Sequence, residues 1–116
     1  MATTLESFSE EKFLAATPTN VFSTTGSQKK YIGKFTLTNT GTTAEEVILW
    51  RLNDTTTPTT TSPGGNWLKK LTVPAGATLE VLQLAGHVLD RSMKIAAQTD
   101  TASTVSCDVS GTTESS

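Results

Sequence analysis

The residues that could carry out chemistry are few and lie far apart in the chain. The single histidine, His87, and the single cysteine, Cys107, are 20 positions apart. A nucleophilic thiol needs a lowered pKa and a base placed beside it. Cys107 instead alternates in register with Val105 and Val109, which predicts that its side chain faces the core. We therefore expect an inert thiol and no catalytic residue.

The sequence also lacks the residues that a metal site, a glycosidase site or a phosphate-binding loop needs. A metal site requires several His, Cys or carboxylate ligands at compatible spacings, and one histidine with one distant cysteine does not supply them. His87 follows Gly86 at a predicted corner, where an imidazole ring commonly caps a turn or lies at an interface. The segment SPGGN lacks the lysine and hydroxyl residue of a phosphate loop. The carboxylates that could act in pairs are expected on solvated faces of the sheets: Glu45, Glu46, Glu80, Asp90 and Asp108. We predict no metal, no cofactor and a function carried by a surface.

Composition and charge narrow the class of protein further. A chain of 116 residues forms one domain around one core. Its net charge is -2 with both signs interspersed, so no basic stripe could neutralise a row of phosphates, and nucleic acid is not an expected partner. No segment reaches the ~20 apolar residues of a membrane span, and the acidic start MATTLESFSEEKF does not look like a secretory signal. One cysteine cannot form an internal disulfide. We expect a soluble protein made in a reducing cytoplasm, without a membrane partner.

The elements that must present this surface are short β-strands. Threonine makes up about a fifth of the chain, and its β-branched side chain favours strands over helices. Apolar and polar residues alternate with a period of two at 79–81, 93–97 and 105–109. About seven to eight such strands predict the all-β class, as a single antiparallel β-sandwich or flattened barrel. A helix over 88–95 is the one competing interpretation of a segment.

Parts of the chain are expected to lie outside the sandwich. We assign three regions: an N-terminal arm at 1–11, a β-sandwich domain at 12–110 and a C-terminal tail at 111–116. The arm carries Leu5 and Phe8 without local apolar partners, and the tail has nothing to pack. The segment NDTTTPTTTSPGGN, 53–66, has no apolar residue except its prolines, which predicts a mobile loop.

Candidate contact residues follow from these exposed parts. Trp67 lies at the exit of the loop, and aromatic anchors dominate protein interfaces. The alternative for Trp67 is the core, because Leu71 and Val73 share its face of the predicted strand. We select four residues for protein interaction: Leu5, Phe8, Trp67 and His87.

The order of motifs resembles that of a group of small bacteriophage virion proteins. The segments FTLTNTGTTAEEVILW and TVPAGATLEVLQLAGHVLDRSMKIAAQTDTASTVSCDVSGTTE carry the resemblance, which spans roughly residues 31–114. The matching elements are an NT turn at Asn39 and Thr40, a proline-glycine turn at Pro74 to Gly76, a G.VL corner at Gly86, an I.A strand at Ile95, and an end at Ser110 with Gly111 and Glu114. One departure is Arg91 and Ser92, which stand where such chains commonly have a glycine-acidic pair.

The resemblance implies a structural part of a phage particle. Most directly it implies a head decoration, or cement, protein bound to the major capsid protein or to a neighbouring virion protein. Such a chain is expected in the virion after synthesis in the host cytoplasm, as a homo-oligomer, with a trimer favoured. Collar, adaptor or fibre components are close alternatives. A carbohydrate-binding adhesion module is an alternative from another class, and it would need an exposed aromatic platform. No catalytic residue or cofactor is implied.

Overall fold

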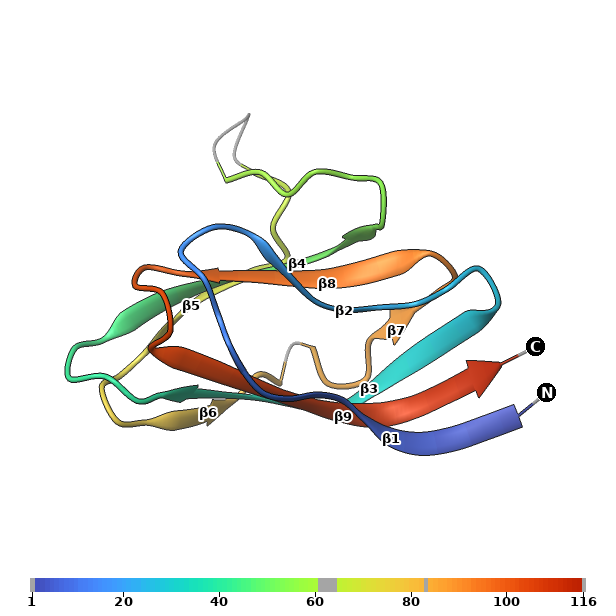
Figure 1. Cartoon of the computed structure of the whole chain (residues 1–116), viewed down its shortest axis with the longest axis horizontal. Coiled ribbons are helices and arrows are strands. Elements are labelled where there is room, and N and C mark those ends of the chain that lie inside the picture. The colour runs from blue at the N-terminus through green and yellow to red at the C-terminus, as the bar shows by residue number, and fades with distance from the viewer. Residues whose placement is uncertain (1, 61–64, 83, 116) are drawn as a thin grey trace.

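Two antiparallel sheets packed face to face make up the structure (Figure 1). The computed structural model describes residues 2–60, 65–82 and 84–115, so the ends of the predicted arm and tail and residues 61–64 of the predicted loop lie outside the described residues. The strands are β1 (Ala2–Phe13), β2 (Thr19–Ser23), β3 (Gln28–Asn39), β4 (Glu45–Asn53), β5 (Lys69–Val73), β6 (Thr78–Glu80), β7 (Val88–Leu89), β8 (Met93–Thr99) and β9 (Val105–Ser115). The predicted all-β sandwich is confirmed. The competing helix over 88–95 is wrong, because β7 and β8 occupy that segment.

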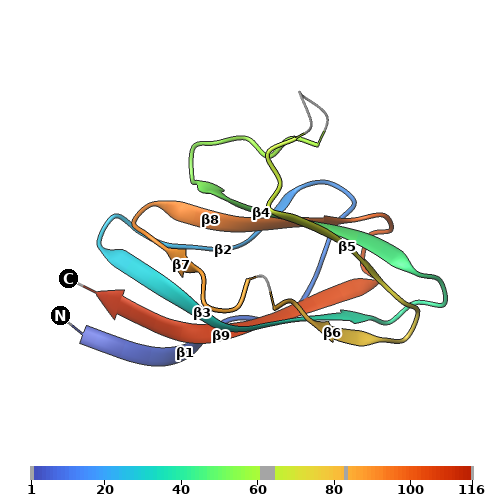
Figure 2. The ribbon, with the colours of Figure 1, turned by 180° about the vertical axis from the view of Figure 1, so that it is seen from behind.

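The strand order is that of a jelly roll. Sheet A runs β1-β9-β3-β6, with β7 also paired to β3, and sheet B runs β2-β8-β4-β5. Strands that follow each other in sequence therefore lie mostly in opposite sheets, as in two Greek keys wound around one core. This winding brings the first and last strands side by side at one edge of sheet A (Figure 2).

The core fills the space between the sheets with alternate side chains of each strand. Phe35 and Leu37 of β3 and Cys107 of β9 point inward and are at most 1% exposed. Sheet B contributes Leu49 and Ile95, both fully buried. The period-two alternation at 93–97 and 105–109 predicted the positions of Ile95 and Cys107, because a strand with one buried face must place an apolar residue at every second position.

A register shift in β3 moves one residue that the alternation placed outside. The pattern puts Ile32 on the face opposite Phe35, yet Ile32 is 1% exposed. The pairing of β3 with β9 shifts between Ile32 and Lys34, so that the parity of the strand changes at Gly33. Opposite the shift lies Gly111, where a Cβ atom would collide with the Tyr31 carbonyl oxygen. Glycine permits the close approach of the two backbones at this bulge.

The predicted arm and tail are strands of sheet A, paired with each other. β1 runs antiparallel to β9, with Ala2 opposite Ser115 and Ser7 opposite Ser110. The expectation that residues 1–11 lack local partners is therefore wrong for the described residues of the arm, and the same holds for the tail. Backbone hydrogen bonds hold this ladder, and they leave no apolar pattern in the sequence.

The segment after β4 folds back over the outer face of sheet B (Figure 1). The Trp50 indole N–H donates to the Thr59 carbonyl oxygen at 3.1 Å. The Asn66 side chain accepts from the Thr59 N–H at 2.7 Å and donates to the Thr57 carbonyl at 3.0 Å. The sequence predicts a mobile, solvated loop, but its described residues cover a buried tryptophan that needs both an apolar neighbour and a hydrogen-bond acceptor.

Buried polar side chains fix two of the turns. Glu45 was expected on a solvated face but is only 4% exposed. Its carboxylate accepts hydrogen bonds from the Thr101 N–H at 2.8 Å and from the Thr104 and Thr99 hydroxyls at 3.1 and 3.3 Å. The fully buried Asn39 donates to the Thr43 carbonyl at 2.8 Å. A buried polar group must find such partners within the protein, and here they close the turns at one end of the sandwich.

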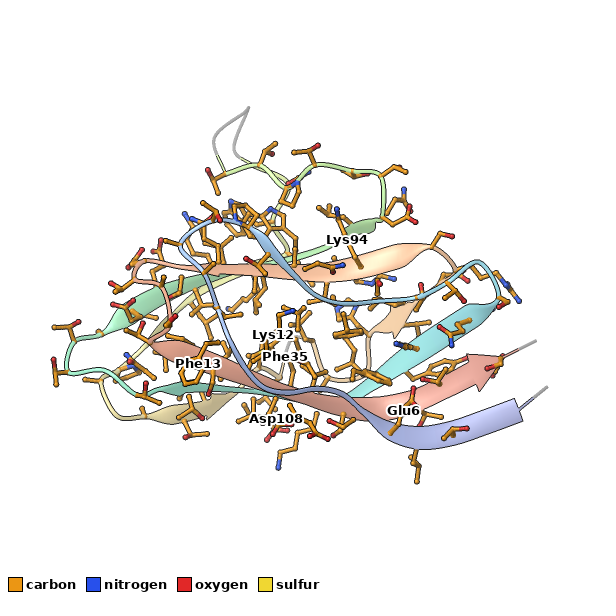
Figure 3. All side chains as sticks on the ribbon, viewed as in Figure 1. Glu6, Lys12, Phe13, Phe35, Lys94 and Asp108 are labelled. Atoms are coloured by element: carbon orange, nitrogen blue, oxygen red, sulfur yellow. The ribbon has the colours of Figure 1, made fainter. Side chains whose placement is uncertain are left out.

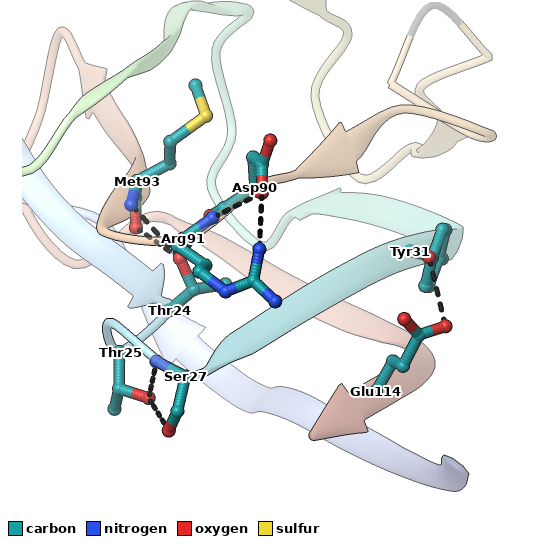
Figure 4. A network of polar contacts seen from close by, with 8 residues as sticks. All are labelled: Thr24, Thr25, Ser27, Tyr31, Asp90, Arg91, Met93 and Glu114. Carbon is teal, nitrogen blue, oxygen red and sulfur yellow. Dashed lines mark hydrogen bonds and ion pairs between the residues drawn. The ribbon is translucent and has the colours of Figure 1, made fainter. Parts of the chain in front are cut away.

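The opposite end of the sandwich is closed by the network shown in Figure 4. The Thr24 hydroxyl donates to the Asp90 carbonyl at 2.6 Å and accepts from the Met93 N–H at 3.0 Å. Ser92, at the position where the sequence departs from the phage pattern, has φ of 57°. That left-handed conformation is one that glycine adopts without steric cost.

Candidate interaction surface

Cys107 is placed where a thiol has no catalytic use. It is 1% exposed, and burial raises its pKa to about 11. A thiol with that pKa is protonated at neutral pH and is a poor nucleophile. The prediction that Cys107 is part of the core is confirmed.

His87 contributes its backbone to a turn. It is half-buried just before β7, its carbonyl accepts from the Ile32 N–H at 2.9 Å, and its N–H donates to the Leu84 carbonyl at 3.1 Å. Within 2–60, 65–82 and 84–115, no group of three or more His, Cys, Asp and Glu side chains could hold a metal ion. The structure thus places His87 at the corner that the sequence predicts.

Phe8 and Trp67 are half-buried and pack against other side chains of the same chain. The ring centroids of Phe8 and Phe22 are 5.0 Å apart, and the Lys30 ammonium lies 5.0 Å from the Phe8 centroid. Trp67 packs against the small cluster around Trp50 on the outer face of sheet B. Both aromatic residues therefore have partners within the chain and do not form free anchors.

Leu5 is the one selected residue that stays open to solvent. Its side chain is 83% exposed, although β1 is firmly paired at this point, with Leu5 opposite Thr112. β1 ends the order of sheet A, so its second side faces no strand within the described part of the chain. Leu5 and the free side of β1 together form an unpaired edge with one exposed apolar side chain among polar ones, which we call the β1 edge.

A second surface lies across the outer face of sheet A and was not found from the sequence. Side chains that alternate with the core positions project outward here (Figure 3). They line a shallow depression of about 550 Å³, the sheet A groove. From β3 and the residue after it come Lys34, Thr36, Thr38 and Thr40, from β9 come Ser106, Asp108 and Ser110, and from β1 comes Phe13.

Phe13 makes this groove different from a plain hydroxyl-rich face. It is 49% exposed and pairs with Ser106 across the β1–β9 ladder. The chain has four phenylalanines, two tryptophans and one tyrosine, all within the described residues, and Phe13 is the exposed one among them. The threonines and serines of this face could be found from the sequence, because they alternate with apolar residues. Phe13 could not, because no pattern in the sequence indicates that its strand pairs with β9 beside Ser106.

The two charged groups of the groove are available to a ligand, whereas the Thr40 hydroxyl already donates to the Thr104 carbonyl at 2.8 Å. Lys34 and Asp108 are both exposed, and neither forms a salt bridge with any described residue. The Thr38 hydroxyl lies 3.1 Å from that of Thr78, so the hydroxyl row continues onto β6. The groove therefore offers one cationic donor, one anionic acceptor, several hydroxyls and one aromatic ring.

No helix among the described residues is long and apolar enough to cross a membrane. Comparisons with protein-family models, with curated proteins and with solved structures gave no match to this chain.

Proposed function

We propose that this chain is a non-enzymatic structural protein of a bacteriophage virion, a capsid decoration protein that binds the major capsid protein. The resemblance over residues 31–114 supports the proposal. So does the jelly-roll strand order, since viral capsid proteins are among the proteins that use this architecture. Fold alone does not decide function, so the proposal depends on the surface that would make the contact.

The observation that carries the proposal is the β1 edge. An edge strand with unpaired N–H and C=O groups accepts a strand from another chain, and such pairing gives affinity through main-chain hydrogen bonds. The register of β1 with β9 is uninterrupted from Ala2 to Ser7 and shifts beyond that point. The regular part of the strand is therefore the part beside Leu5, where a strand of the capsid protein would pair.

Symmetry would strengthen this contact. In the proposal the chain forms a cyclic homo-oligomer, a trimer, so that several β1 edges engage the shell together. Linked contacts raise the overall affinity far above that of one contact. A collar, adaptor or fibre component would use the same edge at fewer positions on the particle.

The test is rebinding of purified protein to virions stripped of it. Leu5→Asp places a charge on the edge, and charged side chains on edge strands oppose pairing with another chain. We expect this variant to rebind at least ~10-fold more weakly, while Leu5→Ile rebinds as the unchanged protein does. Leu82→Asp, at a residue 68% exposed and outside β1, is the matched control. Rebinding of Leu5→Asp at unchanged affinity would refute attachment through the β1 edge.

A further inference from the structure

The sheet A groove has the volume of a small-molecule site. Its volume of about 550 Å³ lies within the range of ligand pockets, and it is open along the sheet. A second depression lined by Ser7, Glu10, Asp108 and Ser110 adjoins it and shares two of its residues. The two together form one hollow surface across β1, β9 and β3, which suits an extended ligand.

The chemistry of the lining selects the class of ligand. Lys34 donates hydrogen bonds, Asp108 accepts them, and the threonine and serine hydroxyls do both. The two charges in the groove cancel, and Glu10 in the adjoining depression adds a negative charge. A phosphate or sulfate group would find one lysine and two carboxylates, so the surface disfavours anions. A neutral ligand rich in hydroxyls matches the donors and acceptors.

The exposed ring of Phe13 adds an apolar platform at the wall of the groove. Aromatic residues combine large contact area with a fixed shape, and they anchor ligands that carry an apolar face. A pyranose ring whose hydroxyls are all equatorial has two such faces of C–H groups. Gluco-configured sugars therefore complement Phe13 on one side and the hydroxyls, Lys34 and Asp108 around their rim.

We propose that the sheet A groove binds a neutral oligosaccharide of gluco configuration, with one sugar ring stacked on Phe13. The ring-binding end of this site, at Phe13, is distinct from the β1 edge, which only the adjoining depression reaches, at Ser7. Phe13 lies eight residues beyond Leu5, a separation of roughly 25 Å along an extended strand. A protein attached to a particle through the β1 edge would still present the groove.

The test is a titration of ¹⁵N-labelled protein with two probes, cellohexaose and hexa-N-acetylchitohexaose, followed by amide chemical shifts. We expect at least one probe to shift signals of residues 34–40 and 106–110. Phe13→Ala is expected to weaken that binding at least tenfold. Asp108→Asn, which keeps the shape of the side chain, is expected to weaken it severalfold. Leu82→Ala, at an exposed residue outside the groove, is the control and is expected to bind normally.

Three results would overturn the proposal. One is the absence of shifts with both probes at millimolar concentration. Another is a set of shifts that falls outside the groove or persists unchanged in both Phe13→Ala and Asp108→Asn. The third is stronger binding of a heparin hexasaccharide at the same residues, because it would identify an anion site. None of these results bears on attachment through Leu5, so the two proposals fail independently.

Discussion

Replacing Phe8 with alanine should destabilise the isolated protein, although the sequence places Phe8 on a free arm. The structure packs the Phe8 ring 5.0 Å from that of Phe22 and beneath the Lys30 ammonium. The same strand carries Leu5, which is 83% exposed and serves as an internal comparison. The two substitutions therefore separate a packed residue from an open one on a single element.

The size of the effect follows from burial. Truncating a fully buried phenylalanine costs about 3–5 kcal/mol, and Phe8 is half-buried, so about 2 kcal/mol is expected from lost packing. Loss of the aromatic pair adds about 0.5–1 kcal/mol. Phe8→Ala should then lower the free energy of unfolding by about 2–3 kcal/mol. Leu5→Ala should change it by less than about 0.5 kcal/mol, as surface substitutions usually do.

Urea unfolding followed by far-ultraviolet circular dichroism measures both variants. With an m-value of about 2 kcal/mol per M, the midpoint of Phe8→Ala should fall by about 1 M or more. Leu5→Ala should unfold at the midpoint of the unchanged protein. Equal midpoints for all three proteins would refute the reasoning, because they would mean that the first half of β1 does not pack on the sandwich in solution.

Three further predictions concern single side chains of the sandwich. Glu45→Ala should lower the free energy of unfolding by about 3 kcal/mol, because the hydroxyl and N–H donors around this buried carboxylate lose their acceptor. A decrease below about 1 kcal/mol in urea unfolding would contradict this. Burial raises the Cys107 pKa from its ordinary value of 9.0 to about 11, so the thiol's contribution to stability is fully present below pH 9 and is lost as the pH rises to 11, by about 3 kcal/mol. In Cys107→Ala this fall between pH 9 and 11 should be absent, and an identical fall in both proteins would show that another group causes it. Ser92→Gly should raise the thermal unfolding temperature and increase the free energy of unfolding by about 0.5–1 kcal/mol, because glycine adopts this left-handed φ without strain. An unchanged or lower unfolding temperature would count against strain at this corner.

The strands that bury one face could be predicted from the sequence. In β8 and β9 the apolar residues recur at every second position, and the structure buries Ile95, Ala97 and Cys107 as that pattern requires. The same pattern fails at Ile32, because a bulge at Gly33 changes the parity of the strand. A bulge depends on how two strands pair, and a single strand's side chains do not encode it.

The edge of sheet A could not be predicted, for a different physical reason. Residues 2–7 are held mainly by backbone hydrogen bonds to β9, which any side chains permit. The burial of Glu45 could not be predicted for a related reason, because it depends on hydrogen-bond donors at Thr99 to Thr104, which are far away in the chain. Phe13 could be assigned to the groove only after β1 was seen to lie beside Ser106. Of the four residues selected for interaction, the structure leaves Leu5 open and gives Phe8 and Trp67 partners within the chain.

Quantitative mass spectrometry of purified virions tests the central claim most directly. In the proposal a phage encodes this chain, so particles of that phage would be purified to homogeneity and the chain counted relative to the major capsid protein. The proposal predicts a high copy number in fixed proportion to the capsid protein, as the symmetry of a shell requires. Absence of the chain from the particles, or a count of about a dozen or fewer as expected for a neck or fibre component, would contradict a decoration protein.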